Sequence, residues 1–349
     1  MAQKSFFARR WKLILNIVTL LALAGLVYAT RDQLMETVTN LRKVNVWVLL
    51  LIIPLEALSY HSQARMYQRM FGIVGTKISY KNLIKASLEL NFVNHVFPSG
   101  GVSGISYFGL RMKSFGARPA QSTSVQTMKL VLLFLSFEVL LLPAMFILSI
   151  HGSASNLTTF IGTSIAMVVL AGTALFAYII GSKSRINAFF TVVTKAVNRV
   201  IQIVRPRHPE TININKAKDA FTEFHETYVE LRSRWRELIA PFWWAVVGNL
   251  VEVLVIYVVY IAFGDWVDIG AIVLAYGIAN VAGLVSVLPG GVGVYEGLMT
   301  TVLATAGISP GVSLPVTVMY RILNTALQIP PGYYFYNRFI RKAKLKTEV

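Results

Sequence analysis

The sequence predicts an all-α polytopic membrane protein, with about six full transmembrane helices and two re-entrant half-helix hairpins arranged as an inverted-topology repeat. Hydrophobic residues make up 55% of the 349 residues and charged residues only 14%, whereas charged residues form about a quarter of soluble domains. Long apolar runs recur along the whole chain, and Pro and paired Gly interrupt two of these runs near their middle. A soluble globular protein is therefore excluded.

Six apolar runs are long enough to cross the hydrocarbon core, which takes about 20 residues per helix. They cover residues 13–29, 46–66, 120–150, 157–181, 240–263 and 312–336. Four basic residues precede the first run, as in a signal peptide, but Thr30, Arg31 and Asp32 form a poor cleavage site. We therefore expect a retained helix.

Two further stretches, 79–115 and 268–307, predict hairpins of two half-helices. Proline and paired glycine break helices and permit a tight reversal, and the pieces beside each break are short or too polar for a crossing. Kinked ordinary spans are the alternative interpretation. The residues at the two breaks are Pro98, Gly100 and Gly101 in the first, and Pro289, Gly290 and Gly291 in the second.

The basic residues predict the orientation of the chain. If the N-terminus is cytoplasmic and each hairpin returns to the side it came from, 28 of 31 Lys and Arg residues lie on one side, when Arg65 at the end of a span is counted with the loop that follows it. Such an excess marks the cytoplasmic side. We therefore expect a multi-pass protein of the cytoplasmic (inner) cell membrane with both termini inside. The net charge of +17 indicates charge at a membrane face rather than nucleic-acid binding.

These elements predict a chain built from two similar units. An odd number of crossings between the units turns the second unit upside down, which gives an inverted repeat. The predicted division is an N-terminal tail and first helix (1–45), repeat A (46–150), a connecting helix (151–181), a basic amphipathic cytoplasmic loop (182–238), repeat B (239–337) and a basic cytoplasmic tail (338–349).

Charged residues recur at matching places in the two units. Lys129 lies 31 residues after Pro98 and Arg321 lies 32 after Pro289, while Glu56 and Glu252 lie within the opening crossings. Buried charges in a membrane usually face an aqueous cavity or one another. We expect Arg321 to bind an anionic group of a substrate and Lys129 to be its counterpart.

Static pairing of Glu56 with Lys129 and of Glu252 with Arg321 is the structural alternative, and Lys129 could also extend to the cytoplasmic surface. Glu296, seven residues after Pro289, is placed beside the centre and joins the candidate site. Glu89 and Glu138 are expected nearer to helix ends, in structural roles.

The paired glycines predict further anion contacts. Half-helices starting at Val102 and Val292 would direct unpaired backbone amides at the bilayer centre, next to Gly100 and Gly101 or Gly290 and Gly291. Close helix packing is the alternative reason for these glycines.

The loop 182–238 carries apolar residues at helical spacing with Lys and Arg between them. This pattern fits a helix lying on anionic lipid head groups, or equally a solvated connector. The chain has no Cys and no recognisable motif for metal binding, nucleotide binding or acyl transfer. We therefore expect no catalytic residues, no metal, no cofactor and no enzymatic activity.

The sequence resembles the transmembrane family of lysylphosphatidylglycerol synthase/flippase proteins. The resemblance rests on Asn94-His-Val-Phe-Pro-Ser-Gly-Gly-Val-Ser-Gly104, on Val287-Leu-Pro-Gly-Gly-Val-Gly-Val-Tyr-Glu-Gly297 and on the span around Arg321. It implies a lipid flippase module that moves an aminoacylated phospholipid between leaflets and contributes to resistance against cationic peptides. Full-length family enzymes carry a soluble aminoacyl-transfer domain, which we expect to be missing here.

Three functions remain open from the sequence. The first is a translocase that moves an anionic or zwitterionic phospholipid, aminoacyl-phospholipid or lipid-linked glycan by alternating access. The second is a proton-coupled secondary transporter of a small soluble anion, using Glu296 or Glu252. The third is a non-transporting scaffold that partners a lipid-modifying enzyme.

Overall fold

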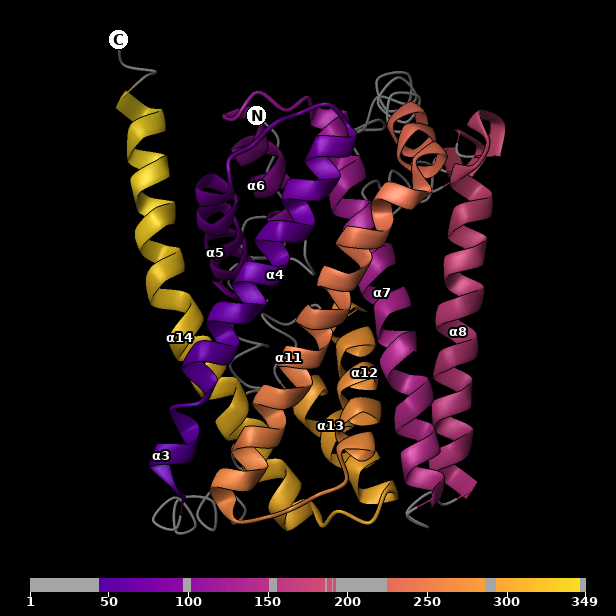
Figure 1. Ribbon diagram of the computed structural model, residues 1–349, viewed down its shortest axis with the longest axis vertical. Coiled ribbons are helices and arrows are strands. Elements are labelled where there is room, and N and C mark those ends of the chain that lie inside the picture. Colours follow the sequence, from indigo (N-terminus) through magenta and orange to yellow (C-terminus); the bar gives the residue numbers. More distant parts are fainter. Residues whose placement is uncertain are drawn as a thin grey trace, which may run out of the picture.

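The computed structural model describes residues 44–96, 102–150, 156–185, 187–189, 191–192, 225–285 and 293–345 (Figure 1). Within these ranges every regular element is a helix, so the all-α prediction is confirmed for the described part of the chain. The elements are α3 (Val46–Leu49), α4 (Ile52–Ile73), α5 (Tyr80–Val96), α6 (Val102–Lys113), α7 (Pro119–Ile150), α8 (Asn156–Ile180), η1 (Trp235–Leu238), α11 (Ile239–Phe263), α12 (Ile269–Val285), α13 (Val294–Thr305) and α14 (Pro310–Leu345).

Four of the described helical segments are long and apolar enough to cross a membrane. They are Val46–Ile73, Pro119–Ile150, Asn156–Ile179 and Trp235–Phe263, and each overlaps a crossing expected from the sequence. The expected crossing 13–29 lies outside the described residues. The expected crossing 312–336 falls within α14, which is 36 residues long and has three prolines in its interior, but α14 is not among the four apolar segments.

Each of the two stretches with a Pro-Gly break contains two helices. In their described parts, helices α5 and α12 have 17 residues each, and α6 and α13 have 12 each. A helix of 12 residues spans only about 18 Å, well short of the roughly 30 Å hydrocarbon core. The breaks themselves, with Pro98, Gly100, Gly101, Pro289, Gly290 and Gly291, lie outside the described residues.

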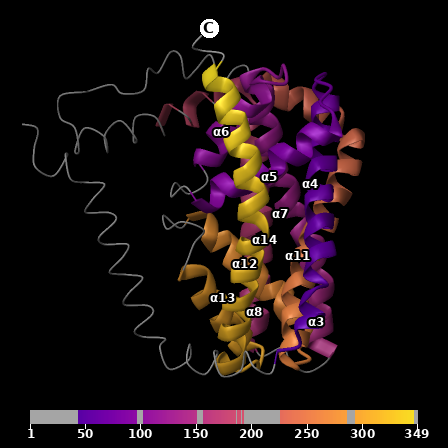
Figure 2. The same cartoon turned by 90° about the vertical axis from the view of Figure 1, so that its left-hand side faces the viewer.

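The two helix pairs occupy opposite halves of the bundle. Helices α5 and α6 lie toward the end where α4 finishes and α7 begins, whereas α12 and α13 lie toward the end where α11 finishes and α14 begins (Figures 1 and 2). Helix α4 packs along α11, α14 along α5, and α12 against both α13 and α7. Each helix pair therefore packs against longer helices, and these longer helices also extend into the opposite half of the bundle.

Buried apolar side chains form two large clusters, one around each helix pair. The first cluster includes Tyr67, Phe71, Leu83, Phe108 and Leu132. The second includes Val253, Ile256, Leu274, Met299 and Leu303. Along α4 the second cluster contains Ile52 and the first starts at Ala64, so the polar residues between them lie at the junction of the clusters.

The outer surface of the bundle is apolar where a membrane would cover it. On α8, Phe160 and Met167 are 68% and 72% exposed, and on α7 Phe146 is 68% exposed. Large exposed apolar side chains of this kind are costly in water but favourable in lipid. The surface of α7 and α8 therefore agrees with a membrane protein.

Candidate functional site

An ion pair joins α14 to the start of α13. Nη1 of Arg321 lies 3.0 Å from Oε1 of Glu296, and the two side chains are 17% and 14% exposed. The other carboxylate oxygen, Oε2, accepts a 2.6 Å hydrogen bond from the backbone N–H of Gly293. The Glu296 carboxylate therefore receives a backbone donor from a helix N-terminus and a guanidinium at the same time, which are two typical anion-binding elements.

The local backbone explains why Glu296 can reach this position. Gly293 precedes α13 with φ 87° and ψ −47°, a conformation that side-chain-bearing residues rarely adopt. Glu296 is the third residue of the helix, so its side chain bends back to cap the N–H of Gly293. The Arg321 guanidinium also lies over the ring of Tyr295, 4.9 Å from its centroid, which holds it at the helix start.

A second polar group lies between the two apolar clusters, on α4, α11 and α14. Glu252 accepts hydrogen bonds from Ser59 Oγ at 3.1 Å and from the Tyr320 hydroxyl at 3.1 Å. Glu56 accepts a 3.2 Å hydrogen bond from Nε2 of Gln328. Two glutamates that lie far apart in the sequence therefore belong to one buried polar group.

Three side chains on one face of α14 connect the two glutamates. Tyr320, Asn324 and Gln328 follow one another at four-residue spacing, which places them on the same helix face. The Asn324 amide donates to the Tyr320 hydroxyl at 3.2 Å, and Gln328 donates to Asn324 Oδ1. We call Glu56, Glu252 and these three residues the central polar network.

The central polar network was only partly foreseen. The sequence indicated its two glutamates from their charge, but the three uncharged residues of α14 were missed. A stripe of polar residues every four positions in an otherwise apolar span was the signal that could have identified them.

Asn249 forms a second polar contact point beside the network. It lies three residues before Glu252 on α11, and its Nδ2 donates to Ser136 Oγ at 2.7 Å and to the Leu133 carbonyl at 2.9 Å. The Tyr276 hydroxyl lies 3.5 Å from Asn249 Oδ1. Polar side chains thus connect α7, α11 and α12 at the same junction.

The static ion pairs considered from the sequence are not formed among the described residues. Arg321 pairs with Glu296 instead of Glu252. Lys129 has no carboxylate of the described chain within ion-pair distance, and its Nζ lies 5.2 Å from the centre of the Tyr67 ring. The two basic residues therefore occupy different environments, because Arg321 has a carboxylate partner and Lys129 faces an aromatic ring.

The two other acidic residues of the spans also differ from each other. Glu89 is buried and binds Arg111 through both of its oxygens, with Arg111 Nη2 at 2.9 Å from Oε1, and it accepts a 2.8 Å bond from Tyr107. Glu89 lies in the middle of α5 rather than near its end. Glu138 lies in the interior of α7 rather than near its end, and it is 6% exposed with neither oxygen hydrogen-bonded within the described chain.

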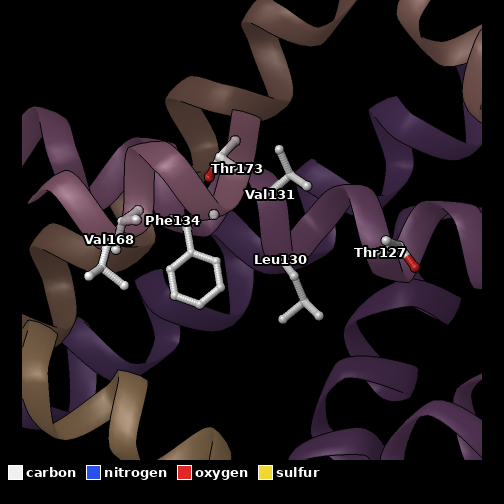
Figure 3. A pocket seen from close by; sticks show the side chains of 8 residues that line it. Thr127, Leu130, Val131, Phe134, Val168 and Thr173 are labelled. Carbon is white, nitrogen blue, oxygen red and sulfur yellow. The ribbon is translucent and has the colours of Figure 1, made fainter. Parts of the chain in front are cut away.

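A cavity of about 300 Å³ lies between α7 and α8 (Figure 3). Its lining is almost wholly apolar and contains none of the candidate site residues. Such a space suits hydrocarbon rather than a charged group. It is lined by Thr127, Leu130, Val131 and Phe134 of α7 and by Val168, Val169, Gly172 and Thr173 of α8.

Most of the basic loop 182–238 and the tail after residue 345 lie outside the described residues. At the border of the loop, Nζ of Lys183 lies 2.8 Å from Oε1 of Glu226. Across the described ranges, no group of three or more His, Asp or Glu side chains is placed to hold a metal ion.

Comparison with known proteins gives a family match over most of the chain. Residues 13–332 match the family described as the lysylphosphatidylglycerol synthase TM region. A UPF0104 membrane protein of Methanocaldococcus jannaschii is 22% identical over 92% of each chain, and one of Pyrococcus horikoshii is 19% identical over 83% of this chain and 86% of its own. A third, from Methanothermobacter thermautotrophicus, is 32% identical, but over only 22% of each chain.

Proposed function

The chain belongs to the lysylphosphatidylglycerol synthase transmembrane-region family, and we propose that it moves a phospholipid with an anionic head group between the two leaflets of a membrane. The relatives are named only as membrane proteins, so the proposal rests on the geometry of the site. The observation that carries it is the position of the Glu296 carboxylate, between the Arg321 guanidinium and the backbone N–H of Gly293.

The Glu296 carboxylate occupies a position that a phosphate oxygen of a substrate could take. Arginine can hold a phosphate with two parallel hydrogen bonds, and the N-terminus of α13 supplies a partial positive charge. In the absence of substrate, Glu296 satisfies both groups. We propose that a lipid phosphate displaces Glu296 from Arg321, so that the charge of the arginine is balanced in both states.

The proposed mechanism is alternating access between two similar units. In it, α5–α6 and α12–α13 are re-entrant hairpins that enter from opposite faces, with the cytoplasm at the end where α4 finishes. The places of the two helix pairs in opposite halves of the bundle support this arrangement. Lys129, which lacks a carboxylate partner in the described chain, would serve the phosphate on the side of the first hairpin.

The lipid tails need a separate, apolar path. The apolar cavity between α7 and α8 supports a route in which acyl chains stay in hydrocarbon while the head group moves inside. A small soluble anion would not need such a route. This difference favours a lipid over the soluble substrate of the alternative function.

Reconstitution of the full chain in liposomes tests the proposal. Phosphatidylglycerol with a fluorescent head group is added, and a membrane-impermeant quencher then measures how much label leaves the outer leaflet. We expect leaflet exchange with the protein, none in empty liposomes, and loss of exchange in Arg321→Ala. Uptake of a soluble anion without lipid exchange would support the alternative transporter, and absence of both would support a scaffold.

A further inference from the structure

The central polar network holds two carboxylates but no cation. Among the described residues, no Lys, Arg or His side chain lies within ion-pair distance of Glu56 or Glu252, and every hydrogen bond that they receive comes from a neutral donor. A buried ionised carboxylate without a counter-charge is costly, and two close together more so. At least one of the two carboxylates must therefore carry a proton.

The hydrogen bonds indicate which glutamate is neutral. Both oxygens of Glu252 accept hydrogen bonds, as suits an ionised carboxylate. Glu56 is only 5% exposed, its Oε2 accepts one bond, and its Oε1 has no partner in the described chain. An unsatisfied neutral carboxyl group costs far less than an unsatisfied charge. The geometry thus fits an ionised Glu252 beside a protonated Glu56.

A second polar side chain, that of Tyr60, follows Glu56 on the same face of α4. Tyr60 lies one turn after Glu56 on α4 and is 9% exposed, and its hydroxyl lies near the Asn91 side chain. Tyr60 also lies close enough to feel the charges of both Glu56 and Glu252. The Tyr60 hydroxyl and Oε1 of Glu56 both lack a hydrogen-bond partner within the described chain, so each can still form one hydrogen bond.

The remaining titratable and polar groups around the pair carry no positive charge. Around the two carboxylates, the other helices contribute Tyr320 from α14, Tyr276 from α12, Tyr295 from α13, the neutral Asn91 from α5, and Ser136 of α7 through Asn249. These three tyrosines and Tyr60 stay neutral at physiological pH, since tyrosine ionises only near pH 10 even in water. Glu56 and Glu252 are therefore the groups in this set that can exchange protons.

We infer that Glu56 and Glu252 form a proton-binding pair, and that proton exchange at this pair drives the lipid movement proposed above. The inference rests on the proposed function. A proton fits better than a metal cation, because a cation needs several oxygen ligands whereas an amide N–H of Gln328 occupies one side of Glu56. The step is a plain proton transfer, in which water on one side supplies the proton to the Glu56 carboxylate and water on the other side receives it.

Helix α14 couples the pair to the substrate site. Tyr320 binds Glu252, and its neighbour in the chain, Arg321, binds Glu296. When Glu252 or Glu56 gains or loses a proton, its hydrogen bond to Tyr320 or Gln328 becomes weaker or stronger. Because both donors belong to α14, the protonation state changes which position of α14 is most stable. Protonation and lipid binding thus act on the same helix.

The test measures the steady-state distribution of head-group-labelled phosphatidylglycerol in liposomes with an imposed pH gradient. One pH unit changes the equilibrium ratio between leaflets by up to about tenfold for each coupled proton. We expect an unequal distribution with the wild-type chain and an equal one with Glu56→Gln or Glu252→Gln. Glu138→Gln is the matched control, because Glu138 is an equally buried glutamate outside the pair, and it should keep the unequal distribution.

A readout without transport separates failure of this inference from failure of the proposed function. Infrared difference spectra of the purified chain after a pH jump should show a carboxyl band that disappears in Glu56→Gln and remains in Glu138→Gln. Lipid exchange that ignores the pH gradient, a response to a sodium gradient in its place, or a band that persists in both pair variants would overturn the inference. If the band behaves as expected but no lipid exchange occurs, the proton site stands and the lipid function fails.

Discussion

The Tyr320 hydroxyl donates a 3.1 Å hydrogen bond to Oε2 of Glu252, so the residue next to Arg321 is tied directly to α11. Through Asn324 and Gln328 the same helix face reaches Glu56 on α4. One long helix therefore carries the cation of the substrate site and the neutral donors of the acidic pair. Changes to α14 should affect both.

Replacing Tyr320 with Phe should weaken the central polar network without leaving a cavity. The change removes the donor to Glu252 and the acceptor of Asn324, and losing such bonds costs about 1–3 kcal/mol when a buried group is left unsatisfied. We expect a lower unfolding temperature in detergent and a weaker response of lipid exchange to a pH gradient. Tyr334→Phe, at a 58% exposed position of the same helix, should leave both unchanged.

Replacing Arg321 with Lys tests the need for a planar two-pronged donor. Lysine keeps the charge but cannot form parallel hydrogen bonds to phosphate, and one charge-assisted bond contributes about 1.5–3 kcal/mol. We therefore expect lipid exchange to fall by about tenfold or more, while the protein stays folded.

The matched control for this change is Arg111→Lys. Arg111 also forms an ion pair with a buried glutamate, at a side-chain exposure of 13%, but outside the proposed site. It should lower the unfolding temperature with little loss of exchange per folded molecule. Normal exchange by a stable Arg321→Ala protein would contradict the role of Arg321 in substrate binding.

Replacing Gly332 with Ala should separate α14 from α5. A Cβ at Gly332 would lie 2.5 Å from the backbone carbonyl oxygen of Leu88 and 2.6 Å from Cβ of Phe92. Neither atom can move without shifting a helix, and overpacking of this kind costs about 1–3 kcal/mol. Thermal unfolding should show the loss. Gly109→Ala on α6, where a Cβ would meet no atom within 4 Å, should be neutral or stabilising.

Single cysteines in this chain, which has none of its own, test the proposed orientation. Ser114 lies in the turn between α6 and α7, and Trp266, which is 76% exposed, lies between α11 and α12. We expect Trp266→Cys to react with an impermeant maleimide in intact cells and Ser114→Cys to react only after permeabilisation. The reverse pattern would place the basic loops outside and refute the orientation.

The sequence predicted the positions of the long helices well, because hydropathy and chain length determine them. The expected crossings 120–150 and 240–263 agree closely with α7 and α11. The expected hairpin stretches 79–115 and 268–307 contain α5 and α6, and α12 and α13, while the breaks themselves lie outside the described residues. The expected crossing 46–66 was less accurate, since α3 ends at Leu49 and α4 continues to Ile73.

Pairings between side chains could not be predicted in the same way. The sequence allowed an ion pair between Arg321 and Glu252, because both residues were expected near the middle of spans. In the structure Tyr320 faces Glu252, and the next residue, about 100° further around the helix, reaches Glu296. The rotation of a helix about its own axis decides such contacts, and it depends on packing against every neighbour.

The unequal composition of the two apolar clusters has a consequence for the order of assembly during synthesis. Among the described residues, most buried members of the first cluster come from 64–132. Tyr228, Leu231 and Ala245, with the partly buried Leu238, Phe242 and Trp244, are added from later in the chain. The second cluster uses Ile52 and the end of α7 together with residues up to Tyr320. Segments fold as they emerge from the ribosome. The first cluster can therefore pack early, whereas the end of α7 and the start of α4 become buried only after the C-terminal helices have been synthesised.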